Sequence, residues 1–146
     1  MDSLLKQNGF TLLEMLLVLG LLMTVSLIAV PSYQAMATDR EEDRFFDNLM
    51  RDIYYAQSES YRTKAPVMVV FRETEGRYEV VQSFKAILPP RKLPATVKLK
   101  AASNLKAVSF SANGSVTAAG TLLFDTSDGE KSLIVHIGKG RLVFSG

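Results

Sequence analysis

The stretch GFTLLEMLLVLGLLMTVSLIAV, residues 9–30, decides how this 146-residue chain is organised. From Phe10 to Val30 only Glu14 is charged. A helix of that run is about 31 Å long, close to the thickness of a bilayer's hydrocarbon layer. It is therefore predicted to span a membrane. An ionised side chain at the middle of a bilayer costs about 2.5 to 3.5 kcal/mol, so Glu14 needs a partner or a function there.

Three interpretations of this segment compete. A secretory signal peptide would be cleaved after Ala37, but its apolar region is typically shorter and follows a positively charged leader. A plain single-pass anchor explains the length but not the charge. Thr11 and Glu14 also fit a capping box, in which both side chains bind free amide donors at a helix start. The third interpretation rests on a family resemblance, described below.

The composition excludes several classes of site. The chain has no cysteine, so disulfide frameworks, thiolate metal sites and cysteine nucleophiles are absent. The single histidine, His136, lies in an alternating stretch and is expected on a strand facing solvent. The acidic pair Glu41–Glu42 is expected on a solvated helix face. We predict no catalytic residues, no metal site and no cofactor.

Residues 31–64 continue a helical pattern after Pro31, with apolar and aromatic residues at spacings of three to four. This stripe is expected to pack on the protein's own sheet, and Pro66 helps to end the helix. The stripe comprises Phe45, Phe46, Leu49, Met50, Ile53, Tyr54, Gln57 and Tyr61.

Residues 65–146 change to the two-residue period of strands. A hairpin closed near Gly76 is expected first, and the three prolines of residues 87–94 predict a loop. Further turns are predicted at glycines, where positive φ is needed. The expected strands are 67–71, 77–81, 96–100, 106–111, 120–124, 132–137 and 141–144. The fold class predicted is α+β, with one long N-terminal helix packed on an antiparallel sheet domain.

The net charge of +2 suggests no partner, but its distribution is uneven. Residues 65–146 carry 11 basic and 6 acidic side chains. Lys98 and Lys100 alternate on one expected strand, so both should leave the same face. Lys106, Lys139 and Arg141 lie on strands or turns that could join them. These five residues are candidate DNA contacts, against the plainer view that scattered lysines keep the domain soluble.

The run from Gly9 to Glu14, with a short polar leader before it and an apolar helix after it, resembles the N-terminus of type IV pilins and pseudopilins. The resemblance implies cleavage by a prepilin peptidase between Gly9 and Phe10, followed by N-methylation of Phe10. It implies that Glu14 neutralises the terminal amine of a neighbouring subunit. Pro31 falls where many pilins have a helix kink.

This resemblance divides the chain into a leader (1–9), a transmembrane half-helix (10–30), an amphipathic half-helix (31–64) and a sheet domain (65–146). It implies a pilin-like fold and a single-pass cell membrane protein whose C-terminal domain lies outside, at the cell surface when assembled. The implied partners are the prepilin peptidase, major and minor pseudopilins, the inner-membrane assembly platform and membrane lipid.

The C-terminal part is similar to the GspH/FimT group of minor pseudopilins, in which Gly-Arg precedes the last strand, here Gly140–Arg141. With no cysteine and small size, the chain most resembles the competence pseudopilins of the ComGD type. The expected function is a minor subunit of a competence pseudopilus that takes up DNA in natural transformation. The alternatives are a type II secretion minor pseudopilin, a membrane-anchored DNA-binding module and, less favoured, a membrane-tethered enzyme.

Overall fold

The computed structural model describes residues 11–138 and 141–145, except for the side chains of residues 28 and 30–32. The predicted cleavage and methylation residues Gly9 and Phe10, and the candidate DNA contact Lys139, lie outside the described residues. The chain divides into two compact units with a boundary between Ala37 and Thr38. Of the residues that the structure describes, all those in strands and all those in the buried core belong to the second unit.

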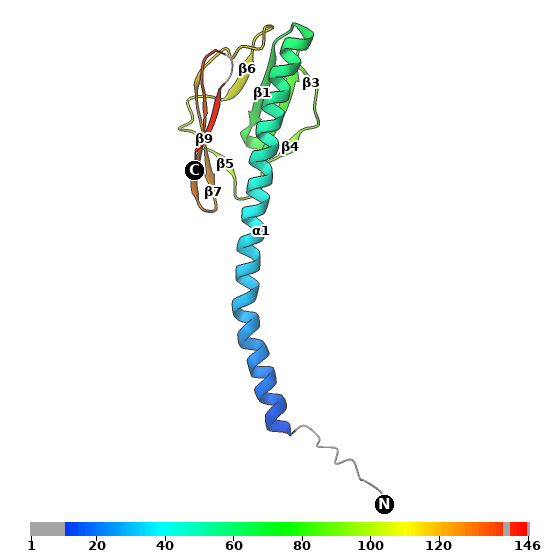
Figure 1. Cartoon of the computed structure of the whole chain (residues 1–146), viewed down its shortest axis with the longest axis vertical. Helices are drawn as coiled ribbons and strands as arrows, with labels where there is room; N and C mark the ends of the chain where they lie inside the picture. Colours follow the sequence, from blue (N-terminus) through cyan, green and yellow to red (C-terminus); the bar gives the residue numbers. More distant parts are fainter. Residues whose placement is uncertain (1–10, 139–140, 146) are drawn as a thin grey trace, which may run out of the picture. The chain divides into compact units, whose positions relative to one another are not determined.

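The helix α1 runs from Leu12 to Thr63 (Figure 1). It is assigned as one helix through position 31, which confirms helix on both sides of Pro31; a kink there stays a prediction. The helix ends where Lys64 adopts a left-handed φ of 54°, and Pro66 follows with no N–H to donate. Among the described residues, no helix combines the length and the apolar character that a membrane span requires.

The first sheet, called sheet A, begins with the predicted hairpin. It consists of β1 (Val67–Arg72) and β2 (Arg77–Gln82), joined by the short 3₁₀ helix η1 (Glu73–Glu75). Gly76 closes the turn with a left-handed φ of 57°, as predicted. The strand order is β3-β2-β1-β6, with β3 at Lys85–Ala86 and β6 at Ala107–Phe110, and β4 (Arg91–Lys92) also pairs with β2. The prediction of a plain loop over residues 87–94 was therefore wrong at β4, because these two residues follow the prolines and can pair with β2.

The second sheet, called sheet B, has the order β5-β7-β8-β9. Its strands are β5 (Lys98–Leu99), β7 (Gly120–Thr126), β8 (Gly129–Val135) and β9 (Leu142–Ser145), and all pairs are antiparallel. Val116 bridges both Phe110 of sheet A and Gly138, next to sheet B. The predicted antiparallel architecture is confirmed, but it consists of two sheets joined at Val116.

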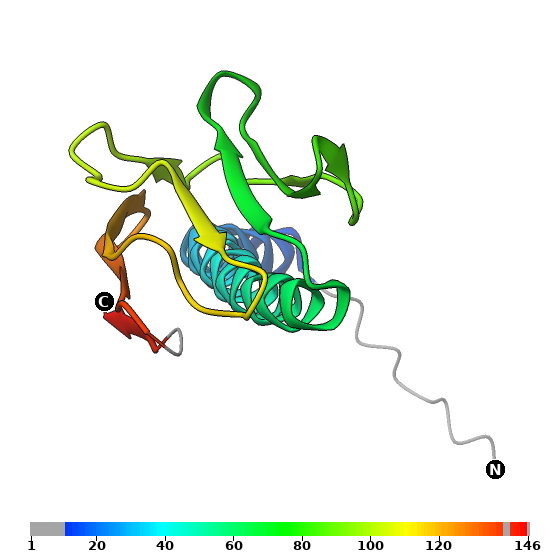
Figure 2. The ribbon, with the colours of Figure 1, turned by 90° about the horizontal axis from the view of Figure 1, so that it is seen from above.

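The core lies where the C-terminal half of α1 meets both sheets. Figure 2 shows β1 and β6 next to this part of α1, with β9 to one side. Phe45 and Phe46 of the helix contact Phe124 of sheet B edge to face, with ring centroids 6.5 and 5.5 Å apart. Phe71 of sheet A lies 5.7 Å from the same ring. One aromatic cluster thus joins the helix to both sheets.

The predicted helical stripe is confirmed at its centre and wrong at its edge. Leu49 and Ile53 are fully buried, whereas Tyr54 and Tyr61 are 47% and 61% exposed. The buried face instead continues through Ala56 and Ser60, both 0% exposed. Each residue turns a helix by 100°, so Tyr54 lies well away from the face that Ile53 occupies.

Candidate assembly segment and basic surface

The first described part of α1, residues 12–27, is an apolar helix with exposed side chains. Every Leu, Met and Val side chain between positions 12 and 27 is exposed, from 48% at Val18 to 82% at Leu12. A helix that is apolar on all sides is normally buried in a large core or in a membrane. Within its own unit this segment has no such core, so its apolar surface is available to lipid or to other helices.

The polar side chains of residues 11–27 are Thr11, Glu14, Thr24 and Ser26. The Glu14 N–H donates to Thr11 Oγ1 at 3.2 Å, so the predicted cap at the helix start is formed on the threonine side. Thr24 Oγ1 donates to the Leu21 carbonyl and Ser26 Oγ to the Leu22 carbonyl, both at 2.8 Å. These hydroxyls are thus satisfied inside the helix and tolerate an apolar environment.

The Glu14 carboxylate is different. It is exposed and makes no hydrogen bond or ion pair with another described residue. Of the four polar side chains in this segment, it is the only charged one, and it has no side-chain partner among the described residues. Its position at the third helical residue places it next to the chain's N-terminal residues in sequence.

The globular unit is held by a buried carboxylate that sequence reasoning missed. Asp52, on the buried face of α1 and 5% exposed, accepts hydrogen bonds from Tyr78 Oη at 2.7 Å and Arg91 Nε at 2.6 Å. Burial and the hydrogen bond to Asp52 raise the pKa of Tyr78 well above its usual range. The cluster fixes α1 to β2 and β4. The available signal was the position of Asp52 three residues after Leu49 and directly before Ile53, which places it beside the predicted stripe.

Glu42 is a second buried carboxylate, and the prediction that it lies on a solvated helix face was wrong. Glu41 is exposed as expected, but Glu42 is 1% exposed and accepts the Ser127 N–H at 2.9 Å. Burial alone would raise the pKa of Glu42, but hydrogen bonds from Thr96 and Ser127 lower it below its usual range. Glu42 therefore anchors the turn between β7 and β8 to the helix, which the local charge pattern could not indicate.

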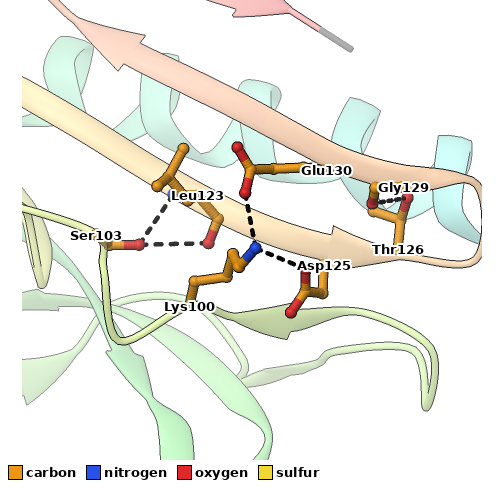
Figure 3. Close-up of polar contacts among 7 residues, drawn as sticks. All are labelled: Lys100, Ser103, Leu123, Asp125, Thr126, Gly129 and Glu130. Atoms are coloured by element: carbon orange, nitrogen blue, oxygen red, sulfur yellow. Dashed lines mark hydrogen bonds and ion pairs between the residues drawn. The ribbon is translucent and has the colours of Figure 1, made fainter.

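Two of the candidate DNA contacts, Lys100 and Lys106, form ion pairs with carboxylates of the same chain. Figure 3 shows Lys100 Nζ between Asp125 and Glu130, at 3.2 and 2.7 Å. Hydrogen bonds to Glu130 and Asp125 raise the pKa of Lys100. Lys106 Nζ lies 2.9 Å from Glu73 Oε1, at the hairpin of sheet A. The positive charges of both lysines are thus partly neutralised within the domain.

Lys98 and Arg141 are the remaining described candidates. Both are exposed and form no ion pair with another described residue. The strand β5 ends at Leu99, so Lys98 lies on the strand and Lys100 just beyond it. His136 is exposed, as predicted, but it lies directly after β8 and not on a strand. Within the described residues, no group of His, Asp and Glu side chains is arranged to hold a metal ion.

Comparison with known proteins connects these features. The family described as "Prokaryotic N-terminal methylation motif" matches residues 4–30. No curated protein sequence matches the chain significantly. Two crystal structures of the type IV minor pilin FimU from Pseudomonas aeruginosa have a similar fold. One, in space group P21, has a TM-score of 0.57 and 17% identity over 75% of this chain and 92% of FimU.

The other FimU structure, in space group P65, has a TM-score of 0.50 and 18% identity over 68% of this chain and 89% of FimU. The similarity covers most of both chains in each case, and the helix-plus-sheets architecture is the common feature. Residues 4–30 of the chain thus match the prokaryotic N-terminal methylation motif, and the fold of the chain is similar to that of a type IV minor pilin.

Proposed function

We propose that this protein is a minor pilin-like subunit of a competence pseudopilus of the ComGD type, a filament that brings DNA to an uptake machinery. The observation that carries the proposal is an apolar helix whose hydroxyls are satisfied internally and whose Glu14 carboxylate has no partner among the described residues. The methylation motif over residues 4–30 and the minor pilin fold support it.

In the proposed maturation, a prepilin peptidase cuts between Gly9 and Phe10, and Phe10 is then N-methylated. The cut creates a terminal amine that can carry a positive charge. The Glu14 carboxylate of one subunit pairs with this amine on its neighbour. In a low-dielectric surrounding the attraction between two such charges is strong, whereas either charge alone is costly. The pair therefore lets a subunit join the filament in one register only.

The apolar surface of residues 12–27 has two proposed environments in this scheme. Before assembly, lipid covers it and the globular unit lies outside the cell membrane. After assembly, the helices of neighbouring pseudopilins replace the lipid. Thr24 and Ser26 allow this exchange because their hydroxyls need no external partner. The proposed partners are other major and minor pseudopilins, the assembly platform in the membrane and lipid.

A type II secretion pseudopilus would use the same helix chemistry, and a type IV pilus is suggested by the FimU fold. The identity of the subunits that co-purify with the chain separates these systems. A role confined to DNA binding is less favoured, because Lys100 and Lys106 already bind carboxylates. No catalytic step is proposed.

The experiment compares Glu14→Ala with Glu41→Ala, which removes another exposed carboxylate of α1. Intact mass of the wild type should show loss of residues 1–9 and one added methyl group. Glu14→Ala should be processed and inserted normally, because removing a charge eases insertion. It should fail to co-purify with other filament subunits, whereas Glu41→Ala should co-purify like the wild type.

Two results would contradict the proposal. A mature N-terminus at Thr38 would support the secretory signal peptide instead. Normal co-purification and transformation by Glu14→Ala would remove the role of this carboxylate in assembly.

A further inference from the structure

We propose that Asn113 is a site of spontaneous covalent modification, which converts to aspartate or isoaspartate in the folded chain at a rate set by the contact between its turn and α1. Asn113 and Gly114 lie in the turn of residues 111–115, which directly follows β6. The inference is independent of the proposed function, because it concerns a reaction within the globular unit.

The position of Asn113 makes its carboxamide accessible to a neighbouring nucleophile. Its side chain is exposed, and the next residue is glycine. A side chain on the following residue shields that residue's backbone nitrogen, and glycine has none. The other described asparagines, at positions 48 and 104, both precede leucine. The Asn-Gly step at positions 8–9 lies outside the described residues. Asn113 is therefore the described asparagine best placed to react.

The reaction needs only water. The Gly114 backbone nitrogen loses its proton to solvent and attacks Asn113 Cγ, which forms a new N–C bond. The C–N bond of the carboxamide breaks, and ammonia leaves with a proton from solvent. The product is a five-membered cyclic imide. Water then opens this ring at the side-chain carbonyl, which gives aspartate, or at the main-chain carbonyl, which gives isoaspartate.

In the closed turn, hydrogen bonds hold both reacting groups. The Gly114 N–H donates to the Ser111 carbonyl at 2.9 Å. Asn113 Oδ1 accepts hydrogen bonds from Ser111 Oγ at 2.6 Å and from the Ser115 N–H at 3.0 Å. Attack requires loss of the amide proton and rotation of the carboxamide, so these bonds must break first. The reaction therefore proceeds from chains in which the turn has opened locally.

The contact with α1 opposes this opening. Gln57 Nε2 donates to the Gly114 carbonyl at 2.9 Å. A Cβ on Gly114 would lie 3.4 Å from Tyr61 Cβ, so the turn lies close against the helix. Aspartate keeps the length of the main chain and an acceptor oxygen, so it is compatible with this contact. Isoaspartate adds one carbon to the main chain before Gly114 and displaces that residue from the helix.

The experiment follows the mass of one peptide. The full-length chain is incubated in detergent micelles at mildly alkaline pH in water labelled with heavy oxygen, and is then digested with trypsin in ordinary water. Peptide 107–131 contains Asn113 as its single Asn or Gln residue, so replacement of NH₂ by labelled OH reports this site. The folded wild type should convert, but several-fold more slowly than the same chain unfolded in urea.

Two variants test the role of α1. Gln57→Ala removes a hydrogen bond that holds the turn, so it should speed conversion about two- to tenfold, the factor expected from one hydrogen bond. Gln82→Ala is the matched control, because it removes a hydrogen bond to Thr63 of the same helix at 2.6 Å and leaves the turn intact. It should convert like the wild type.

The consequence is measured on aged wild-type chains. Chains rich in isoaspartate should have a lower thermal midpoint than Asn113→Asp chains, which carry the same charge on an unaltered main chain.

Four results would each overturn the inference. They are no conversion of Asn113 in the folded chain, conversion as fast as in urea, conversion of Gln57→Ala no faster than that of Gln82→Ala, and equal thermal midpoints of isoaspartate-rich and Asn113→Asp chains.

Discussion

The Asp52 cluster makes the sharpest test of how the helix is held to the sheets. Asp52→Ala removes the acceptor for Tyr78 Oη and Arg91 Nε. Tyr78 is 1% exposed, so its hydroxyl would be left buried without a partner, at a cost of about 1 to 3 kcal/mol. The Arg91 side chain is 46% exposed, so loss of that ion pair adds about 1 kcal/mol or less. We expect a total loss of about 3 kcal/mol in the free energy of unfolding.

Tyr78→Phe is the matched control. It removes the hydroxyl and leaves the Asp52–Arg91 pair in place, so it should cost about 1 kcal/mol. Adding Tyr78→Phe to Asp52→Ala should recover part of the stability, because no unsatisfied hydroxyl then remains. Urea unfolding of the fragment beginning at Thr38, which contains the whole buried core, measures all three variants.

The pH dependence gives an independent readout of the same cluster. The pKa of Tyr78 is raised above its ordinary value of 10.0 by burial and by Asp52. The folded state therefore holds this proton more tightly than the unfolded state. Its contribution is complete below pH 10 and is lost as the pH rises further, by about 1.4 kcal/mol per pH unit. Tyr78→Phe should remove this alkaline slope. An Asp52→Ala loss no larger than that of Tyr78→Phe would refute the reasoning.

Three further predictions concern the same fragment. Because the pKa of Glu42 is lower in the folded protein than its ordinary value of 4.5, this residue stabilises the fold above pH 4.5, and the contribution is lost as the pH falls. Glu42→Gln should therefore make the free energy of unfolding, measured in urea, less dependent on pH in the acid range. Gly120→Ala should cost about 1 to 3 kcal/mol in the same assay, because its Cβ would lie 2.6 Å from both Asn104 Oδ1 and Leu105 Cγ. If the domain binds duplex DNA, replacing Lys98 and Arg141 with Ala should weaken binding and reduce its salt dependence; unchanged titrations at two salt concentrations would exclude both as contacts.

The local features of the fold could be predicted from the sequence because each depends on neighbouring residues. The helix start follows from Thr11, whose hydroxyl accepts an N–H three residues later. The first hairpin follows from two alternating runs around Gly76, which supplies the positive φ. The apolar character of residues 12–27 is likewise a property of composition alone. These interactions span only a few residues, so spacing and residue type specify them.

The tertiary structure decided what happens to charges and aromatic rings. Glu42 and Glu41 are adjacent in sequence, yet only Glu42 is buried, because the β7–β8 turn supplies an N–H there. Tyr54 continues the helical stripe by spacing but is exposed, because the two sheets cover a face centred on Ile53 and Ala56. The sequence pattern did not indicate that Lys100 is ion-paired, because the pairing of strands brings Asp125 and Glu130 next to it.

Such outcomes depend on partners between roughly twenty-five and eighty-five residues away along the chain, as Glu42 with Ser127 and Asp52 with Tyr78 show. The residue pattern specifies which side chains can be buried or paired. The fold decides which of them are, because burial and pairing are set by what the sheets bring next to each side chain.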